Sequence, residues 1–205
     1  NPLLINDERF APAGVLAPKS KADLAFTMHM LSWLAVNGTA AIVEFPGVLY
    51  RGGAEQKIRK YLVDNNFVDA VIQLPPDLFF GTTIATCIIV LKKSKTDNAV
   101  LFVDASDQFK RVGNKNKLQP ENQQRILDLL AHRQSVEHEA ALISSADIAA
   151  NDYNIAVSSY VQAEDTSEVV DITELNAEIA RIVARQAELR ASIDAIVHDL
   201  RGAER

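Results

Sequence analysis

Two apolar segments separated by a short loop constrain the fold of this chain most. Segment 84–91 reads Ile-Ala-Thr-Cys-Ile-Ile-Val-Leu, and the apolar segment before it, 67–74, ends at Pro75-Pro76. A continuous apolar run of this length is typical of a strand that is covered on both faces. The connection 75–83 is too short for a helical crossover, so we expect the second strand to run antiparallel to the first.

A strand–helix–strand pattern precedes this pair. Segment 39–45 reads as a short strand, 54–64 as a helix and 67–74 as the next strand. A helical crossover makes two strands parallel, and successive strands are usually neighbours, so we expect 39–45 and 67–74 to lie side by side. The pattern predicts an α/β fold that is half of a doubly wound sheet ending in an antiparallel hairpin.

Helical periodicity appears on both sides of these strands. A helix is expected to start at an N-cap on Ser20, to stop at Asn37-Gly38 and to be largely buried, because it is apolar well beyond one stripe. In the helix 54–64 we expect Arg59 to point outward. The later segments follow in order as a strand at 100–103, helices at 120–135 and 144–150, and an irregular stretch at 151–161.

Apolar residues recur at steps of three and four from Ile172 to Leu200. Eight of the nine positions in this register are Ile or Leu, and the ninth is Gln186. An isolated helix gains little from propensity alone, so this face should be buried against something. Packing within the chain and a coiled-coil seam with another chain are both open, and the regular register favours the seam.

Composition excludes several classes of protein. With 48% apolar and 23% charged residues, the chain is typical of a globular protein. No apolar run approaches the roughly 20 residues of a membrane span. A single cysteine, Cys87, excludes a disulfide framework and a cysteine zinc cluster, and the four histidines show no metal-ligand spacing. The polar start carries no signal peptide, so we expect a cytoplasmic protein, and a start without Met suggests a piece of a longer one.

Charge is unevenly distributed. Residues 164–205 hold ten acidic and five basic residues and so carry −5 of the net charge of −6. Residues 92–117 hold seven basic residues against three acidic ones. Such a basic cluster is either a solvated loop face or a phosphate contact.

Two loops are candidate binding sites. Phe79 and Phe80 lie at the mouth of the expected hairpin, and because adjacent aromatics cannot share one strand face, we expect one in the core and one exposed. An exposed aromatic there can stack on a nucleic-acid base. The loop around Arg51 follows the carboxyl end of a strand, where open α/β sheets bind ligands.

Three stretches, 45–66, 72–93 and 151–161, together resemble the modification (methyltransferase, HsdM) subunit of type I restriction-modification systems. The resemblance implies the C-terminal half of a Rossmann-like, S-adenosylmethionine-dependent methyltransferase sheet, followed by a helical C-terminal tail. Residues 1–112 would belong to the catalytic domain, 113–170 would form a helical or irregular connecting region, and 171–205 would be a long assembly helix.

The implied activity is methyl transfer from S-adenosylmethionine to the N6 atom of adenine at specific DNA sites. In this family the glycine-rich cofactor motif and the catalytic Asn-Pro-Pro-aromatic motif lie upstream of the matched region. Asn1-Pro2-Leu3-Leu4 lacks the second proline and the aromatic residue. We therefore expect no catalytic residue and no metal site in this chain, and no activity from it alone.

Five residues take roles from the resemblance. Phe79 would stack on the flipped target base, Phe26 would pack near the adenine of the cofactor, and simple core packing is the alternative for each. Arg51, Gly52 and Gly53 would contact DNA at the cleft rim.

The implied partners are DNA, a specificity subunit bound through the C-terminal helix, and the restriction (nuclease) subunit. Two other functions stay open: an assembly module that docks the specificity subunit, and part of a related solitary DNA methyltransferase.

Overall fold

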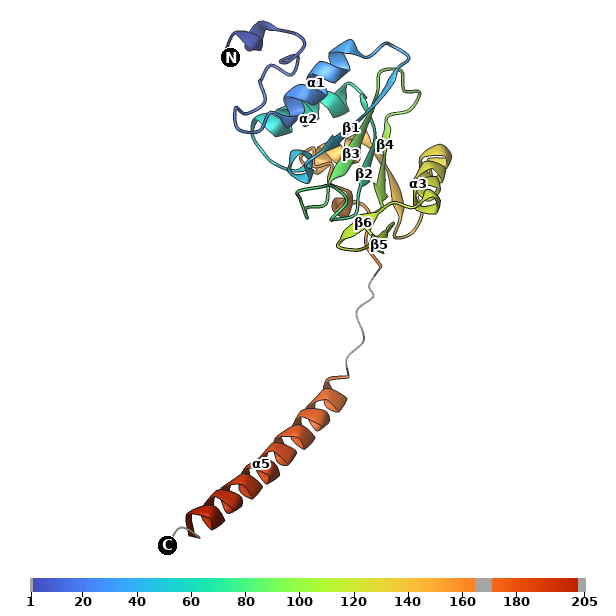
Figure 1. The fold of residues 1–205 in the computed structure, drawn as a ribbon. Coiled ribbons are helices and arrows are strands. Elements are labelled where there is room, and N and C mark those ends of the chain that lie inside the picture. The colour runs from blue at the N-terminus through green and yellow to red at the C-terminus, as the bar shows by residue number, and fades with distance from the viewer. Residues whose placement is uncertain (1, 165–170, 203–205) are drawn as a thin grey trace. The chain divides into compact units, whose positions relative to one another are not determined.

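The computed structural model describes residues 2–164 and 171–202, and the chain divides into two compact units, 1–164 and 165–205. The first unit is an α/β sandwich, and the second contains one long helix (Figure 1). Asn1 and residues 165–170, which include the end of the predicted connecting region, lie outside the described residues.

A five-stranded mixed sheet forms the centre of the first unit. In sequence order its strands are β1 (Thr39–Glu44), β2 (Val68–Gln73), β3 (Cys87–Lys92), β4 (Ala99–Asp104) and β7 (Ala140–Ser144). In space the order is β1-β3-β2-β4-β7. Only β2 and β4 pair in parallel, whereas β3 is antiparallel to both of its neighbours.

The position of β3 confirms one prediction and corrects another. As the short connection indicates, β3 runs antiparallel to β2. The expectation that β1 and β2 are neighbours is wrong, because β3 inserts between them and pairs with both. The helical crossover fixes the relative direction of β1 and β2, but it does not exclude a third strand that fills the space between them.

Helices cover both faces of the sheet (Figure 1). Helices α1 (Asp23–Trp33) and α2 (Ala54–Asp64) contribute apolar side chains to a core on one face. Helix α3 (Pro120–His132) contributes Ile126 and Leu129 to a second core on the other face. Two layers of helices around one sheet bury the apolar strands from both sides.

Local chemistry explains where the later helices begin. Gln119 and Asn122 form a reciprocal capping box at the start of α3, with Pro120 at the first helical position. The short helix α4 (Ser145–Ala150) starts where the Ser144 hydroxyl accepts a hydrogen bond from the Asp147 amide. Three 3₁₀ turns complete the unit, at Pro2–Asn6, Pro46–Leu49 and Val157–Ser159.

Helix α1 differs from its prediction in start, end and burial. It begins at Asp23 with Ala22 as N-cap, so Ser20 does not cap it, and it ends at Trp33 before Asn37-Gly38 is reached. The side chains of Phe26 and Trp33 are 66% and 77% exposed, so the helix is not largely buried. The helix carries apolar residues on all of its faces, but the sheet covers only one of them, so the apolar residues on the other faces stay exposed.

Three strands have no counterpart in the sequence prediction. The pair β5 (Lys110–Val112) and β6 (Lys115–Lys117) forms a small antiparallel hairpin, and β7 joins the edge of the main sheet beside β4. Residues 113–164 therefore pack with 1–112 in one unit. The domain boundaries at 112 and 170 stay a prediction.

Helix α5 (Ile172–Gly202) confirms the helix expected at 172–200. The described side chains of its 3-4 register are exposed, among them Ile182 at 60%, Leu189 at 50% and Ile193 at 59%, whereas the side chain of Leu200 lies outside the described ones. Throughout residues 2–164 and 171–202, no helix combines the length and the apolar character that a membrane crossing requires.

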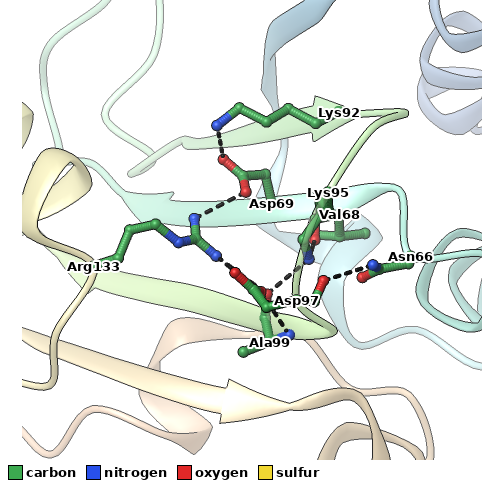
Figure 2. A network of polar contacts seen from close by, with 8 residues as sticks. All are labelled: Asn66, Val68, Asp69, Lys92, Lys95, Asp97, Ala99 and Arg133. Carbon is green, nitrogen blue, oxygen red and sulfur yellow. Dashed lines mark hydrogen bonds and ion pairs between the residues drawn. The ribbon is translucent and has the colours of Figure 1, made fainter. Parts of the chain in front are cut away.

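A polar network joins the strands at the end of the sheet where β2 begins (Figure 2). The nearly buried carboxylate of Asp69 forms an ion pair with Lys92 at 2.9 Å and accepts a hydrogen bond from Arg133 at 2.8 Å. Lys95 donates to the carbonyl oxygens of Val68 and Ala99, both at 2.7 Å. These contacts tie β2, β3, β4 and the end of α3 together at the edge opposite the carboxyl end of β2.

Candidate functional site

The carboxyl ends of β1 and β2 meet at one edge of the sheet. Glu44 and Gln73 end these strands, and both are in register with Cys87, the first residue of β3. The loops 45–53 and 74–86 therefore leave from the same edge, where open α/β sheets bind ligands. Two of the three stretches that suggested a function lie together here.

A buried arginine holds the first of these loops. Arg59 on α2 is 1% exposed, and its guanidinium donates to the carbonyl oxygens of Val48, Arg51 and Tyr153 at 2.9, 2.7 and 2.8 Å. Burial lowers the pKa of Arg59 to about 10, against the opposing effect of Glu55. The expectation that Arg59 points outward is wrong, because it is one step from Ile58 on the buried side of α2.

The third stretch, 151–161, packs against the same loop. The amide of Ile155 donates to the carbonyl oxygen of Leu49 at 2.9 Å, and Gln56 on α2 donates to the carbonyl oxygen of Asp152 at 3.1 Å. The bond from Ile155 holds loop 45–53 directly. The bonds from Gln56 and Arg59 hold segment 151–161 against α2, and Arg59 binds the loop as well. A loop held in this way presents its rim residues in a defined position.

The three residues predicted at the rim differ in their surroundings. Arg51 folds back on its own loop: its guanidinium lies over the Phe45 ring at 5.0 Å and within 3.5 Å of the Glu55 carboxylate. Gly52 and Gly53 are exposed with open space around them, and Gly53 adopts a left-handed φ of 72° that favours glycine. The predicted DNA contact of Arg51, Gly52 and Gly53 stays a prediction.

Both aromatics of the second loop face solvent. Phe79 is 41% exposed and Phe80 102% exposed, so the expectation that one lies in the core is wrong. The hairpin β5–β6 supports this loop, because Lys115 donates to the carbonyl oxygens of Phe79 and Thr82, each at 3.1 Å. The loop keeps its aromatic rings outside the core while its backbone is anchored.

Helix α1 brings Phe26 near the end of β1. The next residue, Thr27, is buried and donates its hydroxyl to the Glu44 carboxylate at 2.7 Å. Burial raises the pKa of Glu44, and the bond from Thr27 opposes that shift. Phe26 is 66% exposed, so it does not pack in the core of residues 2–164, and its predicted contact with the cofactor stays a prediction.

Sequence reasoning missed Glu44, Arg59 and Lys115. A signal existed for Arg59, because Glu55 and Arg59 are four residues apart beside the apolar stripe of α2. Glu44 is the one charged residue of an otherwise apolar strand end, which is a weaker signal. The role of Lys115 depends on a hairpin that no apolar pattern marks.

Metal chemistry finds no support among the described residues, where no group of three or more His, Cys, Asp or Glu side chains is arranged to hold an ion. Cys87 is fully buried, and its burial raises the pKa of the thiol to about 12, so the thiol stays protonated.

Known proteins are similar to this chain in sequence and in fold. A family model described as N-6 DNA Methylase matches residues 1–169. The type I restriction enzyme MpnII methylase subunit of Mycoplasma pneumoniae is 47% identical over 97% of this chain and 37% of its own length. The MjaVII methylase subunit of Methanocaldococcus jannaschii is 32% identical over 86% of this chain and 31% of its own length.

A solved structure gives the same result. The crystal structure of a type I restriction-modification system methyltransferase subunit from Streptococcus thermophilus superposes with a TM-score of 0.77 at 42% identity, covering 79% of this chain and 35% of its own. The chain thus spans about a third of the length of the relatives it matches.

Proposed function

The chain belongs to the N-6 DNA methylase family, and from this premise we propose that the protein containing it methylates adenine N6 in DNA within a type I restriction-modification complex. The proposal includes S-adenosylmethionine as methyl donor and the cytoplasm as the place of action. One observation carries it: the anchored loop 74–86 presents Phe79 and Phe80 to solvent at the carboxyl edge of the sheet.

Exposed aromatics at this edge suit a reaction on a base that has left the helix. An enzyme that modifies a base extrudes it from the duplex and stacks it between aromatic or apolar side chains. Phe79 has the exposure that stacking needs, and Lys115 fixes the backbone of its loop. In this proposal Phe79 holds the base, while Arg51, Gly52 and Gly53 contact the DNA strand at the rim.

The described residues also suit one wall of a site for S-adenosylmethionine. The exposed ring of Phe26 offers a flat apolar face to the adenine of the donor. The bond from Thr27 to Glu44 holds α1, and with it Phe26, against the end of β1. When bound, the donor would supply an electrophilic methyl group to the N6 atom of the target adenine. In this proposal Phe79 orients that adenine and Phe26 flanks the adenine of the donor.

The experiment replaces Phe79 by Ala in the full-length protein and measures methyl transfer to DNA. Stacking contributes about 1–3 kcal/mol per base, so we expect methylation to fall by roughly 5- to 150-fold. Leu127 on α3, 57% exposed, gives a control, because Leu127→Ala removes a comparably exposed apolar side chain away from the loop. Unchanged activity in Phe79→Ala together with a loss in Phe80→Ala would transfer the role to Phe80. Unchanged activity in both would refute the base-stacking loop.

A second function, subunit assembly, is favoured by the exposed apolar register of α5. Its isoleucines and leucines are exposed along the described helix. A contiguous exposed apolar surface usually marks a site where another protein binds. We propose that α5 docks the specificity subunit through a helical seam, and that the nuclease subunit joins the same complex.

A further inference from the structure

The hairpin β5–β6 is strongly basic. Residues 110–117 hold four basic side chains and no acidic one, namely Lys110, Arg111, Lys115 and Lys117. All three residues of β5 are exposed, including the apolar Val112 at 52%. A hairpin with so little apolar burial gains little from the core, so its composition needs another explanation.

Two of the four bases anchor the hairpin to the aromatic loop. Arg111 donates to the Asp77 carboxylate at 3.0 Å, and Lys115 donates to the carbonyl oxygens of Phe79 and Thr82. The buried Asn116 adds a bond to the carbonyl oxygen of Pro76 at 2.8 Å. These contacts hold the hairpin beside Phe79 at the carboxyl edge of the sheet.

The other two bases face each other without compensation. Lys110 and Lys117 are directly opposite in the β5–β6 register, and both are exposed. Within the described part of the chain, neither ammonium group forms an ion pair or a hydrogen bond. Like charges directly opposite across two strands destabilise a hairpin, and an anion bound between them would remove this repulsion.

We propose that the hairpin β5–β6 binds the sugar-phosphate backbone of DNA through Lys110 and Lys117. This inference rests on the proposed function, because it places the phosphate contact next to the loop that stacks the target base. The backbone on either side of a base held by Phe79 must pass close to that loop, and the hairpin is bonded to it. The charge complements phosphate, and lysine binds phosphate as a point charge.

The salt dependence of DNA binding by the full-length protein tests the proposal. Each phosphate contact contributes about 0.9 to the slope of log K against log salt. In Lys110→Gln/Lys117→Gln we expect a slope smaller by about 1.8, so that the rise in Kd between about 50 and 200 mM salt is about 12-fold smaller than in the unaltered protein. Neither lysine side chain supports the fold through a described contact, so the variant should fold normally.

Lys57→Gln/Lys60→Gln is the matched control, because it also removes two positive charges from exposed lysines. Both lysines lie on α2, which packs on the other face of the sheet from α3, so this variant should leave the slope unchanged. If the double variant keeps the slope of the unaltered protein, the hairpin does not bind phosphate and the proposal is wrong. If it keeps that slope but loses a protein subunit, the hairpin binds an acidic protein surface, which also overturns the proposal.

The methylation assay separates this inference from the proposed function. If the unaltered protein fails to methylate adenine, the proposed function is wrong, and the change in slope still decides whether the hairpin binds DNA. If the unaltered protein methylates adenine, and the slope of log K against log salt falls in the double variant but not in the control, both proposals are supported.

Discussion

The guanidinium of Arg59 is enclosed by carbonyl groups of three separate segments. It binds the loop after β1 at two points and the segment 151–157 at a third. A planar cation with several fixed donors suits this task, whereas lysine offers a single point charge. Arg59 therefore joins residues that are far apart in the sequence at the back of the candidate site.

Replacing Arg59 by Met should destabilise the chain strongly. Hydrogen bonds to a charged group contribute about 1.5–3 kcal/mol each, and carbonyls left without a partner add a penalty, so we expect the free energy of unfolding to fall by roughly 3 kcal/mol or more. Urea unfolding followed by circular dichroism measures this. The control Lys57→Met alters an exposed residue of the same helix and should change the free energy by less than about 0.5 kcal/mol. Equal effects of the two substitutions would contradict this role of Arg59.

Glu44 gives the chain a pH dependence with a defined sign. Burial raises the pKa of its carboxyl above the usual 4.5, so between these two values the folded chain holds a proton that the unfolded chain releases. Stability therefore falls as pH rises from about 4.5 through the raised pKa, and it then levels off. Glu44→Gln keeps an oxygen that accepts from Thr27 but carries no charge.

The Glu44→Gln variant should be more stable than the unaltered chain at about pH 7, and this difference should disappear as the pH falls well below 4.5, where both side chains are neutral in the folded and the unfolded chain. Urea midpoints across this range test the prediction. A variant that is less stable at neutral pH would show that the ionised carboxylate stabilises the fold.

At the scale of the element, the network of Figure 2 shows how charged groups join strand ends. The side chain of Asp69 is 8% exposed and forms ion pairs with two cations, whereas the Asp97 side chain is 51% exposed at the rim of the same network. We expect Asp69→Asn to lower the free energy of unfolding by about 1–3 kcal/mol, because it weakens the charge-assisted hydrogen bond from Arg133 and removes the ion pair with Lys92.

Asp97→Asn is the matched control for this network. It makes the same chemical change at an exposed position and should cost less than about 1 kcal/mol. Urea unfolding of both variants provides the comparison. If the two cost the same, burial of Asp69 does not determine the strength of the network.

The elements also show what sequence patterns reveal and what they leave out. Apolar runs predicted the strands β1 to β4, and the short connection predicted the direction of β3 correctly. The position of β3 between β1 and β2 depends on pairing between distant segments, which no local pattern records. The hairpin β5–β6 is built from lysine and asparagine, so it has no apolar alternation to detect.

The candidate site shows the same division. Loop positions at strand ends pointed to Phe79 and Arg51, because strand ends are local features of the sequence. The exposure of Phe26 was not predictable, since it depends on how the sheet covers α1. The contacts of Arg59 and Lys115 join segments that are distant in the sequence.

At the scale of the whole molecule, the chain combines a unit with an apolar core and a unit in which no described side chain is buried. The family comparison confirms the predicted resemblance, and the solved relatives confirm the α/β methyltransferase fold. Residues 165–205 contain one described helix whose apolar register is exposed. A single helix in water gains little stability from its own hydrogen bonds, so the register of α5 needs a covering surface.

Two charged substitutions in that register should abolish docking. Ile182→Asp/Leu189→Asp places carboxylates in the proposed seam, where burying them without partners costs several kcal/mol. We expect the full-length variant to lose co-purification with its specificity subunit. The helix itself should persist, because both positions are already exposed to solvent.

Ala184→Asp/Ala191→Asp is the matched control, since it adds the same two charges to the same helix at exposed positions outside the 3-4 register. If the seam lies on the isoleucine and leucine face, this variant keeps the specificity subunit. If both variants lose the subunit, added negative charge rather than the apolar face controls docking. If both keep it, the subunit binds elsewhere and the register of α5 is covered by a different surface.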